Sequence, residues 1–154
     1  MNAAPPGAAL RARALRLLAR REFARAELRG RLQAWAEPSD DVDGLLDSLQ
    51  SAGWLSDERA AQSAARRRAG RSGALALAHD LRRRGIAGEA AEAVLGPARD
   101  SEPLDARALL RRRFPEPPAD AAERARRWRF LQARGFAPES IRAALAGLAA
   151  EDDH

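Results

Sequence analysis

The sequence predicts an all-α protein, an elongated and curved array of three tandem three-helix repeats with about nine helices. Three observations predict it: strong helix formers dominate, β-branched residues are nearly absent, and one short motif occurs three times. Ala, Leu, Arg and Glu lie near the top of the intrinsic helix scale. Val42, Ile86, Val94 and Ile141 are the only Val or Ile residues among 154. No β-sheet is therefore expected.

The repeated motif consists of Leu, three residues, Gly, a large apolar residue, two residues and an acid. It occurs at residues 49–57, 81–89 and 131–139. In each copy the glycine is expected to end a helix in the left-handed conformation, and the apolar residue to fold back on the corner. The acid then lies in the first turn of the next helix, where the helix dipole favours a negative charge. The motif predicts three helix-turn-helix corners.

The remaining elements follow from apolar residues at helical spacing, from a Ser39/Asp40 cap, and from breaks at Gly96-Pro97 and at residues 115–118. The expected helices or apolar stripes are 10–18, 28–35, 42–49, 56–69, 73–84, 88–95, 101–114, 119–134 and 138–149. The expected domains are a disordered N-terminus at 1–9, three-helix repeats at 10–55, 56–98 and 99–149, and an acidic tail at 150–154.

Residues suited to catalysis are scarce. The chain has no Cys, Tyr or Lys, and its only histidines are His79 and His154. A disulfide, a thiol nucleophile and a thiolate metal site are excluded, and His79 is expected to lie at the surface or an interface. The acids between Asp40 and Asp47 suit a helix start better than a metal site. We therefore expect no enzyme activity, no metal and no cofactor.

The sequence also predicts the cellular location of the protein. The first residues lack a long apolar segment of the kind found in signal peptides, and no stretch approaches the length of a membrane span. We expect a cytoplasmic protein that does not contact a membrane, and a monomer.

Positive charge is concentrated in the middle of the chain. All 27 basic residues are arginines, and residues 59–142 contain 19 of them against 10 acids. This surplus predicts an anionic partner, although an arginine near a helix C-terminus can also be merely solvated. Because consecutive residues of a helix point in different directions, no arginine triplet can engage one partner with all its members. The candidate partner-binding residues are Arg66, Arg67, Arg68, Arg71, Arg82, Arg83, Arg84, Arg111, Arg112, Arg113, Arg127 and Arg134.

Three tryptophans allow two interpretations. Trp35, Trp54 and Trp128 lie among arginines, and aromatic rings beside arginine can stack the bases of single strands. Each also stands at an apolar position of its helix or corner. Core packing is therefore the favoured interpretation, with base stacking as the alternative.

Three sequence signatures resemble the RecX family of recombination regulators. The first is Leu18-Ala-Arg-Arg-Glu-Phe-Ala-Arg-Ala-Glu-Leu28, the second Gly53-Trp-Leu-Ser-Asp-Glu-Arg-Ala60, and the third Phe130-Leu-Gln-Ala-Arg-Gly-Phe136, continuing to Ile141 and Leu145. They occur in the family's order, and the resemblance extends from about residue 10 to residue 148.

The resemblance implies a regulator that lies in the groove of the RecA recombinase filament on single-stranded DNA. It would limit filament growth, ATP turnover and strand exchange, with no catalytic residues of its own. Weak direct contact with DNA is compatible with this role. The alternative is a helical protein whose arginines bind nucleic acid directly, without a recombinase partner. A third interpretation is a helical scaffold whose arginine content reflects only genome composition.

Overall fold

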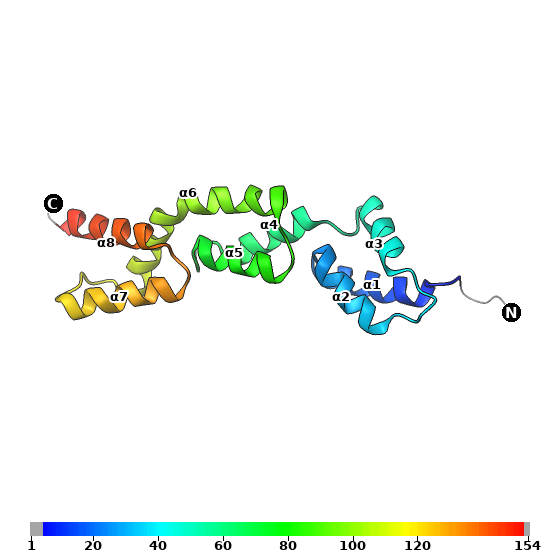
Figure 1. The fold of residues 1–154 in the computed structure, drawn as a ribbon. Helices are drawn as coiled ribbons and strands as arrows, with labels where there is room; N and C mark the ends of the chain where they lie inside the picture. The colour runs from blue at the N-terminus through cyan, green and yellow to red at the C-terminus, as the bar shows by residue number, and fades with distance from the viewer. Residues whose placement is uncertain (1–4, 153–154) are drawn as a thin grey trace.

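The computed structural model describes residues 5–152, with side chains as far as Gly147, and this part of the chain is all-helical. The eight helices are α1 (Ala8–Arg20), α2 (Arg25–Trp35), α3 (Val42–Ser51), α4 (Asp57–Arg68), α5 (Ala74–Arg83), α6 (Gly88–Arg113), α7 (Ala121–Ala133) and α8 (Pro138–Asp152). Figure 1 shows an elongated body with α1 near one end and α8 near the other. The predicted all-α class is confirmed.

Both terminal boundaries differ from the prediction. Helix α1 begins at Ala8, inside the segment expected to be disordered, and α8 continues to Asp152, inside the expected acidic tail. Residues 1–4 and 153–154, and with them His154, lie outside the described part of the chain.

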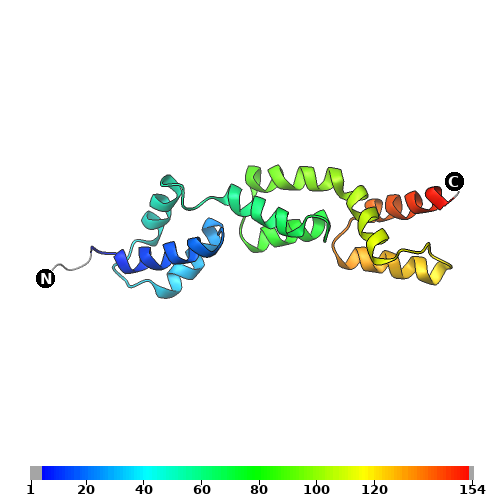
Figure 2. The ribbon, with the colours of Figure 1, turned by 180° about the vertical axis from the view of Figure 1, so that it is seen from behind.

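The predicted break at Gly96-Pro97 is wrong. Residues 88–113 form one helix, α6, which contains both Pro97 and Pro103. A proline inside a helix removes one backbone hydrogen bond and bends the helix, but tertiary packing can keep it continuous. The first part of α6 packs against α4 and α5, and the later part packs against α8. Figure 2 shows α6 changing direction between them, so eight helices are found where about nine were expected.

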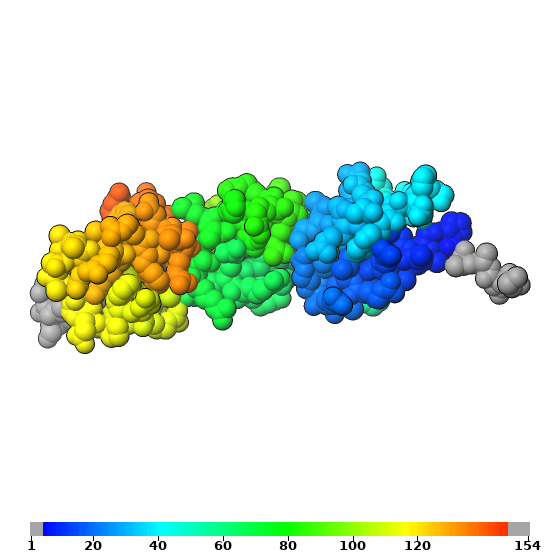
Figure 3. Space-filling view, turned by 90° about the horizontal axis from the view of Figure 1, so that it is seen from below, coloured from blue at the N-terminus to red at the C-terminus, as the bar shows by residue number. Residues whose placement is uncertain are grey.

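Apolar side chains gather in three clusters along the body. Leucines from α1 to α3 form the first, including Leu28, Leu32 and Leu46. Small residues dominate the second, where Ala61 and Ala64 allow close helix contacts around Leu81. The third lies around α6, α7 and α8. Figure 3 shows the corresponding bodies side by side in one row.

The three predicted corners are present. Gly53, Gly85 and Gly135 have φ angles of 82°, 76° and 80°. In every copy the amide of the apolar residue that follows the glycine donates back to the carbonyl of the motif's leucine, for instance Phe136 N to Leu131 O at 3.2 Å. This is the hydrogen-bond pattern that closes a helix on a left-handed glycine. Each corner therefore joins two helices as the motif predicts.

The predicted burial of the tryptophans is confirmed only in part. Trp128 is half-buried against the third cluster, but Trp54 is 54% exposed and Trp35 is 38% exposed. At the first corner Leu55 occupies the buried position that Ile86 and Phe136 occupy at the others. Trp35 is the last residue of α2 and lies under the guanidinium of Arg13 on α1.

Candidate partner-binding surface

The predicted arginines differ in how far internal contacts occupy their charge. Arg127 is only 6% exposed, and its guanidinium lies over the Phe114 ring with its carbon 5.0 Å from the centroid. Its Nη2 is 3.9 Å from a carboxylate oxygen of Glu123. Arg127 is therefore part of the packing of the third repeat.

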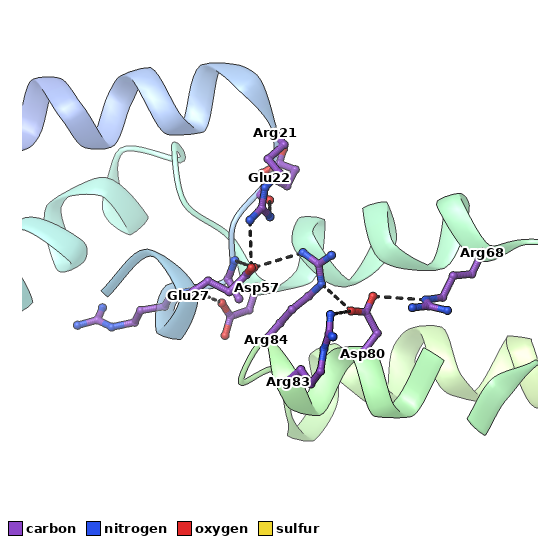
Figure 4. Close-up of polar contacts among 10 residues, drawn as sticks. Arg21, Glu22, Glu27, Asp57, Arg68, Asp80, Arg83 and Arg84 are labelled. Carbon is purple, nitrogen blue, oxygen red and sulfur yellow. Dashed lines mark hydrogen bonds and ion pairs between the residues drawn. The ribbon is translucent and has the colours of Figure 1, made fainter. Parts of the chain in front are cut away.

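Arg84 is also held inside the molecule. Its side chain is 16% exposed and reaches between two acids from different repeats (Figure 4). Nη1 lies 3.4 Å from Glu27 Oε1 on α2, and Nε lies 3.2 Å from Asp80 Oδ1 on α5. The same Glu27 accepts from Ala24 N at 3.1 Å at the start of α2. Arg84 thus joins the first repeat to the second.

Asp80 is the centre of this network. The carboxylate is buried and also receives Arg68 and Arg83, each at 3.4 Å. Burial by itself would raise the pKa of Asp80, but the hydrogen bond and charge of Arg84, with the charge and hydrogen bond of Arg68, outweigh it and hold the pKa below its ordinary value.

Acid should therefore weaken the ion-pair network that holds the Arg84 side chain in place. Because the folded-state pKa of Asp80 is lowered, its contribution is present above the unfolded-state pKa of about 4 and is lost as the pH falls through the folded value. We expect Asp80→Asn to lower the unfolding free energy by about 2 kcal/mol at pH 7. The deficit relative to the parent should shrink below about pH 4 in urea melts. A deficit independent of pH would contradict this account.

Other polar contacts add to this junction. Asp57 Oδ1 accepts from Arg25 N at 2.7 Å, and Arg59 Nε lies 3.1 Å from Glu22 Oε1. Arg21 also pairs with Glu27, with Nη2 3.2 Å from Oε2 (Figure 4). Apart from Ala24, which joins the second cluster, much of this junction consists of charged groups. Neither Glu27 nor Asp80 was predicted from the sequence as a functional residue.

The second and third repeats meet through backbone contacts instead. Gly73 N donates to Arg134 O at 2.9 Å, and Leu75 N donates to Gly135 O at 3.1 Å. Two side chains of the third repeat bind the loop before α5: Arg134 Nη1 donates to Arg71 O at 3.3 Å, and Arg112 Nη2 donates to Gly70 O at 2.8 Å. The α7–α8 corner is therefore fixed against the start of α5.

This docking gathers arginines that are distant in sequence. A hollow of about 350 Å³ at the junction is lined by Arg67, Arg68, Arg71, Ser72, Ala76, Ala133 and Arg134, with no acid among them. We call Arg67, Arg68, Arg71, Arg112 and Arg134 the junction cluster. Arg67 and Arg71 are exposed, whereas Arg68 also contacts Asp80. The cluster can present several guanidinium groups to one ligand. Three consecutive arginines of one helix cannot do so, because they point in different directions.

The other predicted arginines lie apart from this hollow. Arg82 and Arg83 are exposed at the end of α5 nearest the first repeat. Arg111 and Arg113 are exposed in the last turn of α6, with Arg113 over the Phe114 ring at 5.2 Å. Arg66 is exposed in the last turn of α4. These residues extend the positive surface, but none of them lines the hollow.

A buried acid that the sequence did not reveal supports the junction. Glu102 on α6 is 4% exposed. Its Oε1 accepts from Ala74 N at 2.8 Å, and its Oε2 accepts from Ser140 Oγ at 2.6 Å and from Ala137 N at 3.4 Å. One carboxylate thus satisfies donors at the starts of both α5 and α8, which have no partner within their own helices.

The fold is that of an all-helical tandem-repeat protein, with positive charge gathered where two repeats meet. The family model for the third three-helix domain of RecX matches residues 105–145. Two proteins called regulatory protein RecX are similar: that of Ralstonia pickettii is 43% identical over 90% of this chain and 87% of its own, and that of Chromobacterium violaceum is 41% identical over 97% of both. The chain belongs to the RecX family of regulatory proteins.

Solved structures agree with this fold. The crystal structure of RecX from Lactobacillus salivarius superposes with a TM-score of 0.73 at 18% identity, covering 92% of this chain and 95% of that one. A second RecX crystal structure superposes with a TM-score of 0.71 at 20% identity, and the match covers 88% of this chain and 70% of that one. Among the described helices, none has both the length and the apolar character needed to cross a membrane.

Proposed function

We propose that this protein binds the RecA filament on single-stranded DNA and restrains filament growth, ATP hydrolysis and strand exchange. It would act by binding alone, as a monomer in the cytoplasm, with no metal or cofactor. Membership of a family of regulators supports a regulatory role. The observation that carries the proposal is the junction cluster, because it offers several arginines in one acid-free hollow.

The shape of the protein suits an extended partner. Repeat arrays offer a long surface rather than one deep pocket, and this body is long in every view (Figures 1 and 3). Exposed arginines at the end of α5 nearest the first repeat and at the end of α6 in the third repeat extend the positive surface beyond the junction cluster. Several weak contacts can therefore act together on neighbouring subunits of a filament.

The experiment is to titrate the protein into cognate RecA hydrolysing ATP on single-stranded DNA. Binding to the same DNA without recombinase is followed in parallel. We expect inhibition at fewer than one protein per recombinase subunit, at a salt concentration where binding to bare DNA has been lost, since phosphate contacts weaken steeply with salt. Tight binding to bare DNA without inhibition would instead support direct nucleic-acid binding.

Charge reversal tests the junction cluster. Arg67→Glu with Arg71→Glu should raise the concentration for half-inhibition at least about tenfold, because attraction becomes repulsion at two exposed sites. The matched control is Arg99→Glu, whose arginine is exposed and pairs only with Glu92 among the described residues. Equal inhibition by both proteins would remove the cluster from the interface. Arg84 is left unchanged because it joins two repeats.

A further inference from the structure

The first repeat carries an exposed aromatic ring among arginines that form no ion pair with any described residue. Trp35 ends α2, and the guanidinium carbon of Arg13 lies 4.9 Å from its ring centroid. A hollow of about 310 Å³ is lined by this pair together with Arg16, Leu17 and Arg20. The hollow belongs to α1 and α2, whereas the junction cluster belongs to α4, α6 and the α7–α8 corner.

No described acid neutralises the charge around this ring. Helix α1 contains four arginines and no acid. Among the described residues, Arg13, Arg16 and Arg20 form no ion pair, whereas Arg21 pairs with Glu27 and Arg25 with Asp47. Arginines and acids are nearly equal in number over the first repeat. In the structure, however, the charged residues of α1 are all arginines, so this helix carries a positive surface.

These groups match one class of ligand. A nucleobase can stack on an indole ring or on the plane of a guanidinium, and nearby arginines neutralise the phosphates on either side. An acidic peptide fits less well, because the face of an aromatic ring carries the negative part of its quadrupole. A duplex keeps its bases stacked on each other, so the ring requires an unpaired base.

We propose that the Trp35 hollow binds an unpaired nucleobase of a single strand, with Arg13, Arg16 and Arg20 holding its phosphates. This site goes beyond the proposed function, because it needs no recombinase and uses none of the arginines of the junction cluster. Trp54 is the natural comparison: it is more exposed than Trp35, but no arginine of the described part of the chain lies over its ring.

The test measures binding of a fluorescent oligo-dT strand by anisotropy at low salt, without recombinase. Trp35→Ala should weaken binding about tenfold, because a tenfold loss of affinity corresponds to the free energy of stacking one base on an aromatic ring. Trp35→Phe keeps a ring and should retain most of the affinity. Trp54→Ala should bind like the parent. Thermal melting of each variant establishes that it is folded.

A strand of abasic sites separates stacking from charge. The parent should bind it about tenfold more weakly than oligo-dT, whereas Trp35→Ala should bind both strands equally. Parent-like binding of oligo-dT by Trp35→Ala would overturn the proposal, as would equal weakening on both strands. Weaker inhibition of RecA by Trp35→Ala with unchanged DNA binding would also overturn it, by making the hollow a protein contact.

Discussion

Gly135→Val is expected to lower the unfolding free energy by at least about 3 kcal/mol. The φ angle of Gly135 is +80°, a conformation that a β-branched residue resists. An added Cβ would also lie 2.5 Å from Ala76 Cβ and 2.6 Å from Ala76 N. Helix α5 would therefore have to move away from the α7–α8 corner, which breaks the hydrogen bond from Leu75 N to Gly135 O.

The matched control for this variant is Gly53→Val. Gly53 has the same conformation, with φ +82°, but a Cβ there would meet no atom within 4 Å other than those of its chain neighbours. The control bears the backbone strain alone, about 1–2 kcal/mol. Urea denaturation followed by circular dichroism compares the two. Equal losses would show that the contact with Ala76 contributes nothing, and a parent-like Gly135→Val would contradict the corner itself.

The corners could be predicted from sequence because their physics is local. A leucine, a glycine four residues later and an acid after that are enough to end one helix and begin the next. The burial of the apolar residue was less predictable. At the first corner two apolar residues, Trp54 and Leu55, are adjacent, and only tertiary packing decides that Leu55 faces the core.

The continuity of α6 could not be predicted for a similar reason. A Gly-Pro pair usually ends a helix, but the segments on both sides of Gly96-Pro97 pack against neighbouring helices. Local propensity predicts the break, and the tertiary contacts of α4, α5 and α8 override it.

The candidate surface was predictable in residue type but not in arrangement. Composition identified the arginines, yet it could not show that Arg127 packs on Phe114 while Arg71 and Arg134 line one hollow. Those two residues meet only because the α7–α8 corner docks on α5. Glu102 was missed because its partners, Ala74 and Ser140, are distant in sequence. Asp80 was missed because its burial and its contact with Arg68 depend on how α4 packs on α5.

Glu102→Ala is expected to cost about 4 kcal/mol of unfolding free energy. Hydrogen bonds to a charged group contribute about 1.5–3 kcal/mol each, and a buried donor left without a partner is costly. The variant removes the acceptor for Ala74 N and for Ser140 Oγ, both in buried surroundings. The starts of α5 and α8 lose their common partner, so the junction between the second and third repeats should open.

Glu102→Gln distinguishes charge from shape. It keeps the size and one acceptor oxygen, and its NH₂ group can donate to Ser140 Oγ but cannot accept from Ala137 N, so about half the loss is expected. Asp100→Ala, at an exposed acid of the same helix, should cost less than about 0.5 kcal/mol.

Hydrogen exchange locates the effect of Glu102→Ala within the chain. The amides of Ala74 and Leu75 should exchange faster, while those in the core of the first repeat keep their rates. Because Arg134 and Arg71 meet only when the corner is docked, the proposed inhibition of RecA should also weaken with the open junction. Parent-like exchange at Ala74 would show that Glu102 does not hold the repeats together.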